Sequence, residues 1–401
     1  MKRNGIRGLV FLAAAALALQ LLPWRPAVAG LTSLSSLLSL LGALAARAAP
    51  AGILFGLPVL ILGFFRSRWF CRYACPVGFA TEGIGRLNPK GRRRFARLPH
   101  IGRGLFLILL GGAAAGYPLF IWLDPLSIFT GFFSAWRAPL TWPAVVLAAG
   151  FPLVLLISLV LPQAWCHRIC PLGALQDFLT IARRKRELRH AAAAPESARP
   201  AFSRRAFLGA AAGGAVALAL RRLLPGRTAP LRPPGARPEA EFTGLCARCG
   251  ACIRACPYQI LRPDFGEAGL TGLLAPVIDY AKAHCFEYCN ECTRVCPTGA
   301  IERLSLEAKR ALALGLAAVD RDHCIAWRDG EYCMVCQEFC PYLAIDMTEH
   351  NGVHCPVVKP DLCRGCGACQ VNCPAQPVKA IVVQGTPQRP VRPLPDAAGP
   401  A

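Results

Sequence analysis

Cysteine is the residue type in this sequence with the clearest capacity for chemistry. The chain has 401 residues and 21 cysteines, and their grouping decides whether they form disulfides or bind metal. After residue 241, most of them form four runs that each end in Cys-Pro. The runs are Cys246-Cys249-Cys252-Cys256, Cys285-Cys289-Cys292-Cys296, Cys324-Cys333-Cys336-Cys340 and Cys363-Cys366-Cys369-Cys373.

The spacing of these runs indicates iron–sulfur clusters. The first and the last run follow the Cys-x2-Cys-x2-Cys-x3-Cys-Pro pattern, in which three thiolates hold one cluster and the fourth holds its neighbour. The second and third runs carry insertions. Structural zinc prefers separated Cys-x2-Cys pairs, and a disulfide lattice does not account for the repeated Cys-Pro endings. The sequence therefore predicts four [4Fe–4S] clusters in residues 241–385.

Four other cysteines form two matching pairs near the N-terminus. Both pairs read Cys-x3-Cys-Pro-x-Gly and follow a tryptophan, which makes an internal repeat of about 95 residues. The pairs are Cys71 with Cys75 and Cys166 with Cys170. Four thiolates in one layer suit one further [4Fe–4S] cluster. His167 and His100 are candidates for an extra ligand or a proton relay.

The remaining cysteine and two histidines have plainer interpretations. Cys355 is left over from every run, and we expect it to be a buried spare thiol. His284 and His323 each precede the first cysteine of a run, and we expect them beside the clusters or on the surface rather than on iron.

The elements around the cysteine pairs are apolar. The chain is 54% hydrophobic and only 17% charged, and a membrane span needs about 20 apolar residues. Five segments approach that length, at residues 5–22, 50–65, 103–123, 142–161 and 206–220. We therefore expect four or five transmembrane helices, with 31–46 as an interfacial or re-entrant helix. Buried core helices are the alternative.

The charges orient these expected spans. The chain carries 45 basic and 23 acidic residues, a formal charge of +22. Basic residues gather before the first span and in stretches 66–103 and 162–205, so the positive-inside rule places the N-terminus and both cysteine pairs in the cytoplasm. Residues after 225 would then be periplasmic. The basic runs lack aromatic stacking residues, which argues against nucleic acid as a partner.

A second targeting signal precedes the last apolar segment. Residues 203–209 read Ser-Arg-Arg-Ala-Phe-Leu-Gly, which fits a twin-arginine export signal; a plain basic flank is the alternative. The expected domains are a polytopic membrane domain at 1–182, a basic stretch with the signal helix at 183–224, a Pro/Arg-rich linker at 225–240, a four-cluster domain at 241–385 and a disordered tail at 386–401.

Two families resemble the two halves of the chain. Residues 50–180, with the paired Cys-x3-Cys-Pro motifs, resemble the polytopic ferredoxin-type membrane protein NapH. Residues 203–385, with the export signal and four cysteine runs, resemble its exported partner NapG and the related MauM. The resemblance implies a fold with an α-helical membrane domain of four or five transmembrane helices plus an α+β ferredoxin-like domain built from two two-cluster modules. A bacterial inner-membrane location follows from it.

The resemblance also implies how the runs share ligands. In four-cluster subunits of this kind the outer runs form one two-cluster module and the inner runs another. By that nested arrangement Cys373 would join the first run and Cys256 the fourth, while Cys340 would join the second and Cys296 the third. Sequential sharing, of run one with two and of run three with four, is the alternative.

The expected function is a membrane-anchored electron carrier. The resemblance implies that it takes electrons from the membrane quinone pool, with quinol as a candidate substrate, and passes them to a periplasmic reductase, dehydrogenase or cytochrome c. A maturation factor for a periplasmic metalloenzyme and a membrane redox regulator are the alternatives. Asp124 follows an expected span. It is a candidate functional acid or a cap for the turn at Pro125.

Overall fold

The computed structural model describes residues 2–19, 27–47, 53–88, 99–134, 142–191, 204–223 and 230–391. They divide into two units. Unit 1 contains residues 1–225 together with 240–251 and 295–300, and unit 2 contains 226–239, 252–294 and 301–401. The first cysteine run is therefore divided, because Cys246 and Cys249 belong to unit 1 and Cys252 to unit 2.

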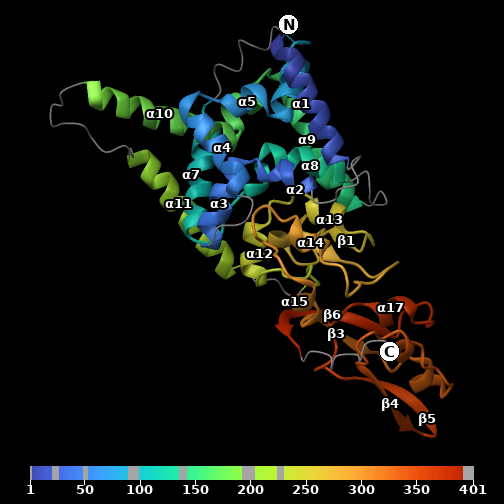
Figure 1. The fold of residues 1–401 in the computed structure, drawn as a ribbon. Helices are drawn as coiled ribbons and strands as arrows, with labels where there is room; N and C mark the ends of the chain where they lie inside the picture. Colours follow the sequence, from blue (N-terminus) through green and yellow to red (C-terminus); the bar gives the residue numbers. More distant parts are fainter. Residues whose placement is uncertain are drawn as a thin grey trace, which may run out of the picture. The chain divides into compact units, whose positions relative to one another are not determined.

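Unit 1 is helical (Figure 1). Its helices are α1 (Lys2–Ala18), α2 (Ala27–Ser33), α3 (Ser36–Ala46), α4 (Ile53–Phe65), α5 (Trp69–Tyr73), α6 (Pro76–Gly85), α7 (Ile101–Ala114), α8 (Pro125–Ser134), α9 (Trp142–Val160), α10 (Pro171–Ala191) and α11 (Arg204–Leu223), with a π-helical turn at Trp165–Ile169. Helices α6, α8 and α10 each begin with proline. The first residue of a helix has no partner within the helix for its N–H, so proline, which has no N–H, loses nothing there.

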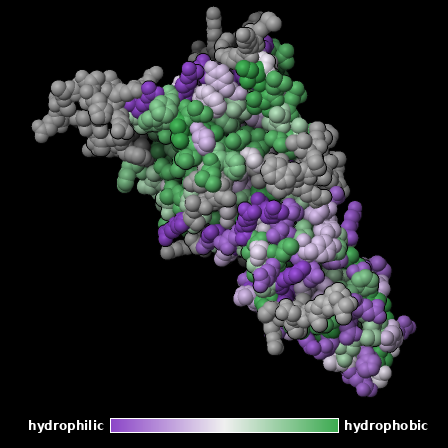
Figure 2. Space-filling view, viewed as in Figure 1, coloured by the Kyte–Doolittle hydropathy of each residue, from purple (hydrophilic) through white to green (hydrophobic). Residues whose placement is uncertain are grey.

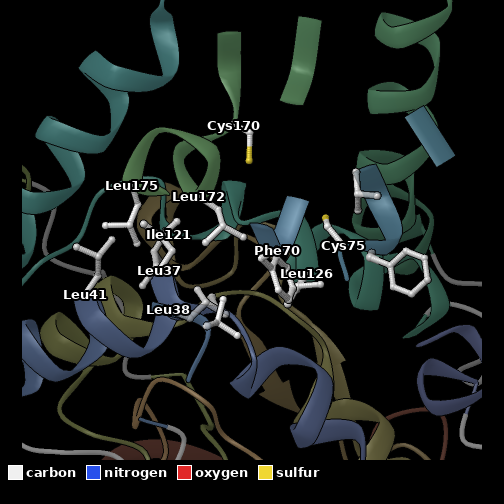
Figure 3. Packing of buried hydrophobic residues seen from close by; sticks show 14 of the residues in the cluster. Leu37, Leu38, Leu41, Phe70, Cys75, Ile121, Leu126, Cys170, Leu172 and Leu175 are labelled. Carbon is white, nitrogen blue, oxygen red and sulfur yellow. The ribbon is translucent and has the colours of Figure 1, made fainter. Parts of the chain in front are cut away.

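The core of unit 1 surrounds two of the paired cysteines. Leu37, Leu38, Phe129 and Leu172 are completely buried and belong to one apolar cluster. Figure 3 shows Cys75 and Cys170 among the apolar side chains of this cluster. The two thiols are thus held within the apolar core of unit 1.

Helix α11, which contains the expected signal segment, packs closely on α7. A Cβ atom at Gly111 would lie 1.8 Å from the carbonyl oxygen of Ala210, and one at Gly213 would lie 2.4 Å from that of Ile108. Only glycine permits such an approach. Ser203 of the expected twin-arginine motif lies outside the described residues.

The expected transmembrane architecture is wrong for the part of the chain that the structure describes. No helix there combines the length and the apolar character needed to cross a bilayer. Helices α1, α4 and α7 have 17, 13 and 14 residues, and at 1.5 Å per residue each is shorter than a hydrocarbon core of about 30 Å. In residues 103–123, for example, α7 ends at Ala114 and turns follow, so an apolar stretch that hydropathy counts as one is divided.

The apolar residues behind that expectation remain largely on the surface. Leu54, Phe55 and Leu153 are exposed on α4 and α9. Figure 2 shows apolar surface over the helical part of the chain and a more polar surface over residues of unit 2.

Asp124 caps helix α8. Its carboxylate is fully buried and accepts hydrogen bonds from the Ser35 hydroxyl at 2.6 Å and from the backbone N–H groups of Leu126 and Ser127 at 3.0 and 3.1 Å. Burial raises its pKa to about 6, although these three donors favour the charged form. The capping interpretation of Asp124 is confirmed.

Unit 2 is built from short elements. Its strands are β1 (Leu261–Pro263), β2 (Pro276–Ile278), β3 (Leu312–Val319), β4 (Ile345–His350), β5 (Val353–Val358) and β6 (Ile381–Pro390), which form three antiparallel pairs, β1–β2, β3–β6 and β4–β5. Short helices α14 (Glu291–Arg294), α15 (Leu306–Arg310), α16 (Val335–Glu338) and α17 (Ala368–Asn372) lie between these strands in the sequence, and α13 (Ala251–Ala255) precedes β1. Helix α12 (Glu239–Leu245), before the first run, belongs mostly to unit 1. Strand β6 continues into the expected tail.

A glycine brings the fourth cysteine run onto the sheet. Gly365 has φ 62°, and a Cβ atom there would lie 2.6 Å from the backbone nitrogen of Gly315 in β3. Any side chain would push the loop between Cys363 and Cys366 off the strand. The fold observed is therefore a helical unit and a mixed α/β unit, in which cysteine loops pack on small sheets.

The raised pKa of Asp124 predicts pH-dependent stability. The folded chain keeps this proton up to about pH 6, whereas an unfolded chain releases it near pH 3.9, so the stabilisation present at low pH is lost as pH rises through 6. Relative to Asp124→Asn, the wild type should lose about 1 kcal/mol of unfolding free energy between pH 5 and 7.5. Urea unfolding at both pH values measures this, and an equal difference at the two would contradict it.

Candidate iron–sulfur sites

The two cysteine pairs of unit 1 share one local geometry. In each pair the first cysteine lies on a short helical turn, α5 or Trp165–Ile169, and the second is extended just before a helix that starts with proline. A Cβ atom at Gly78 or Gly173 would lie 2.9 Å from the carbonyl oxygen of the first cysteine of its pair. This close approach is the physical reason for glycine in the Cys-x3-Cys-Pro-x-Gly motif.

The structure brings all four of these thiols together, and we call them the N-terminal quartet (Cys71, Cys75, Cys166 and Cys170). Burial raises the pKa of each thiol, and for three of them neighbouring thiols raise it further. The N–H of Gly78 donates to the sulfur of Cys75 at 3.4 Å. Four buried thiolates repel one another unless a cation lies between them, so the donor set fits an iron–sulfur cluster.

A single metal ion fits these thiols less well. Within the described ranges, no three His, Cys, Asp or Glu side chains are arranged to hold one ion. A zinc ion with bonds of about 2.3 Å needs its sulfurs close together, whereas a cluster of four irons accepts sulfurs that are farther apart. The zinc alternative at the quartet is therefore disfavoured by geometry.

Arg68 connects the two halves of the quartet. Its guanidinium donates two hydrogen bonds to Asp177 of α10, at 2.7 and 2.6 Å, and one to the carbonyl oxygen of Cys166 at 3.1 Å. A further bond at 2.9 Å joins it to Nδ1 of His167. Since arginine only donates, this nitrogen accepts, so the proton of the neutral ring is on Nε2.

A polar cavity adjoins one side of the quartet. It has a volume of about 420 Å³ and its lining includes Cys71 and Cys166, the first cysteine of each pair. Arg7, Arg68 and Arg72 also line it, with Glu82 and His167. Cys75 and Cys170 are not part of this lining, so the quartet has one polar side and one apolar side.

Two groups of thiols in unit 2 follow sequential sharing. Site 2 contains Cys256 together with Cys285, Cys289 and Cys292 of the second run. Burial raises the pKa of the Cys292 thiol most, and the nearby thiols of Cys285, Cys256 and Cys289 raise it further. Site 3 contains Cys373 with the third run. Burial raises the pKa of Cys336 to about 12, with further contributions from Cys333, Cys324 and Cys373.

The third group, site 4, contains Cys340 with the fourth run. Burial raises the pKa of Cys369, as do Cys366, Cys363 and Cys340. In each of the three groups the last cysteine of one run joins its sequence neighbour. The nested sharing that the family resemblance implied is therefore wrong for these sites, because the runs that fold together are adjacent in the chain.

Sites 2 and 4 are joined by a backbone hydrogen bond. The N–H of Cys285 donates to the carbonyl oxygen of Cys366 at 2.9 Å. Buried Tyr280 lies beside the same junction, where its hydroxyl donates to the carbonyl oxygen of Gly365 at 2.7 Å. Burial raises the pKa of Tyr280, and cysteines of both sites raise it further.

A buried lysine compensates charge at site 2. Lys309 of α15 is 6% exposed, and its ammonium donates to the carbonyl oxygens of Phe286 and Cys289. It also lowers the pKa of Cys285, although burial raises that pKa overall. Neither Lys309 nor Arg68 stands in a motif, so only the fold reveals them.

The remaining candidates occupy plainer positions. Cys355 is fully buried in β5, and its thiol donates to the carbonyl oxygen of Ala326 at 3.5 Å. His323 bonds to Asp320 on the surface and His284 stacks on Phe286. The grouping of Cys246, Cys249, Cys252 and Cys296 stays a prediction from the sequence.

Comparison with known proteins connects both sets of cysteines to iron–sulfur binding. A family model described as a 4Fe-4S binding domain matches residues 48–97 and 143–189, which include the N-terminal quartet. A 4Fe-4S dicluster domain matches 245–327, and a further 4Fe-4S binding domain matches 360–376. Several [4Fe–4S] clusters are thus supported. No solved structure matches the chain.

Curated relatives resemble the C-terminal part. The chain is 36% identical over 153 residues to the methylamine utilization ferredoxin-type protein MauM of Methylorubrum extorquens, covering 36% of this chain and 67% of the relative. It is 36% identical over 197 residues to the ferredoxin-type protein NapG of Escherichia coli, covering 44% and 84%. The NapH-like membrane half that we expected is not supported, since the described residues contain no membrane-crossing helix.

The Arg68 contacts predict a role in cluster retention. Arg68→Lys keeps the positive charge but loses the planar guanidinium, which donates to Asp177 and to the carbonyl oxygen of Cys166 at the same time. We expect the purified variant to lose about four irons per chain, the content of one cluster. Metal analysis measures this, with Arg72→Lys on the same cavity as the control. Equal iron in both variants would contradict the prediction.

Proposed function

Because the chain belongs to the family of NapG- and MauM-like ferredoxin-type proteins, we propose that it is a five-cluster electron carrier that serves a periplasmic redox partner. The observation that carries this proposal is the series of buried thiol groups in unit 2. [4Fe–4S] clusters held there would each take up and release one electron. The chain's own residues hold, separate and electrostatically tune the sites.

The contacts in unit 2 support one order of electron transfer. Site 2 meets site 4 through the hydrogen bond from Cys285 to Cys366, and site 4 meets site 3, since Cys336 is among the thiols that raise the pKa of Cys369. By the same sequential sharing, Cys296 would join Cys246, Cys249 and Cys252 in a further cluster, as the sequence predicts. The proposed order within unit 2 is therefore site 2, site 4, site 3.

The N-terminal quartet would serve as a separate redox site. The polar cavity beside Cys71 and Cys166 offers a small donor access to it, with Arg72 and Gln163 on its lining. A quinol headgroup, which has two hydroxyl groups to be bonded, is the donor class that we propose for this cavity. Its oxidation would release two protons to water in the cavity and two electrons, which the quartet cluster would take up one at a time, passing the first to another cluster before it accepts the second.

The sharing of ligands can be tested with paired substitutions. In Cys340→Ser/Cys366→Ser both changes fall on site 4, so about four irons per chain should be lost. In Cys340→Ser/Cys289→Ser they fall on sites 4 and 2, so about eight should be lost. Metal analysis with EPR counts the clusters. The opposite ranking would restore nested sharing.

The proposed function is tested by anaerobic redox titration. Dithionite should bleach the iron–sulfur absorbance, and an oxidised c-type cytochrome should restore it through reversible one-electron steps. A second arm adds a soluble quinol, which should reduce the wild type but not Cys71→Ser/Cys166→Ser if the quartet is the entry point.

Each arm has a distinct contrary outcome. Bound zinc in place of iron, or iron that cannot be cycled between redox states, would overturn the electron-carrier function and favour a maturation role. Reduction by dithionite but not by quinol would remove only the quinol donor.

A further inference from the structure

We propose that the exposed face around site 3 is the docking surface for a basic redox protein. This inference rests on the proposed function and names the partner class. The surface, which we call the site-3 face, is the segment Glu331–Leu343, which contains Cys333 and Cys336 of site 3 and Cys340 of site 4.

The site-3 face exposes large apolar side chains. Tyr332, Phe339 and Leu343 are 74%, 51% and 71% exposed. Backbone hydrogen bonds from Phe339 to Val335 and from Leu343 to Cys340, at 3.1 and 3.3 Å, keep the segment compact. Exposed aromatic and apolar groups gathered over a functional site are typical of the centre of a protein interface.

The sequence that contains these apolar groups is acidic. Residues 320–349 contain seven acidic residues and two arginines, a net charge of −5, in a chain of +22. The acidic residues are Asp320, Asp322, Asp329, Glu331, Glu338, Asp346 and Glu349. Both arginines are engaged, Arg321 over the Trp327 ring and Arg328 with Asp329.

Three of the acidic side chains are free to meet a partner. Glu331, Glu338 and Glu349 are exposed, and they form no ion pair within the described part of the chain. Exposed apolar side chains that share a segment with exposed acids complement a partner whose own apolar patch carries Lys and Arg, because charge complementarity steers encounter and fixes orientation.

The location suits electron exchange. Site 3 lies at the end of the order proposed above, so an electron that arrives there has no further site within unit 2. Cys333 is half-buried on this segment, which places the site close to the surface. On docking, one electron would pass from the reduced chain to the partner; no bond would form and no proton would move.

The experiment uses the dithionite-reduced, desalted full chain and a cationic mitochondrial-type ferricytochrome c as the probe. Stopped-flow absorbance follows its reduction. Glu331→Gln/Glu338→Gln should lower the second-order rate constant about 3- to 10-fold at low salt. The difference should fall below about 2-fold at 0.5 M salt, where charges are screened.

A matched control removes the same charge elsewhere in unit 2. Glu302→Gln/Glu307→Gln changes two other exposed acids and should leave the rate constant unchanged. A second variant, Leu343→Ser, should weaken anaerobic binding of the same cytochrome at low and high salt alike, because it removes apolar contact rather than charge.

Two further measurements, the iron content and the rate at which the reduced chain reduces a neutral dye, distinguish failure of the docking face from failure of the electron-carrier function. If both are normal and the rate constant of Glu331→Gln/Glu338→Gln equals that of the control, the docking face is wrong and the electron carrier stands. If the wild type cannot be reduced, the proposed function fails first. Self-association that sedimentation detects in the wild type and not in the variant would assign the face to a second copy and overturn the proposal.

Discussion

The fold depends on keeping thiolate charge in a buried place. A cysteine must lose its proton to bind iron, yet burial raises the pKa of the thiols of the N-terminal quartet and of site 4. The chain must therefore surround each group with iron, N–H donors and fixed cations, or the thiols stay protonated. The proline-started helices and the glycine loops at Gly78 and Gly365 provide close N–H groups, and Arg68 and Lys309 provide cations.

The two units meet this constraint in different ways. Unit 1 places the second cysteine of each pair at the start of a helix, α6 or α10, where the partial positive charge of a helix N-terminus favours an anion. Unit 2 has only short helices, so its loops pack against strands and Lys309 reaches in from α15. An apolar core around Cys75 and Cys170 is compatible with the first solution, while mixed polar contacts fit the second.

Sequence reasoning found the cysteine groups because ligand spacing is a local property. It placed Cys71, Cys75, Cys166 and Cys170 together from a repeat alone. It left nested and sequential ligand sharing both open, because which runs pack together depends on strand pairing such as β3 with β6, which joins residues about 70 apart. It could not find Arg68 or Lys309, whose partners lie far along the chain. Hydropathy identified the apolar residues of α4 and α7 correctly, but it gives no information on the turns at which these helices end.

One hydrogen bond shows which sites of unit 2 are neighbours. The contact from Cys285 to Cys366 joins the two pairs of runs at sites 2 and 4, so site 3 is left at the far side of site 4. Tyr280 and Tyr342 are buried and lie beside cysteines of both sites, where they exclude water from this junction. The exposed, acidic loop at site 3 is the opposite environment. The same series of sites thus has a buried internal junction and an exposed, acidic end, a distribution that suits the proposed exchange of electrons with a protein partner at site 3.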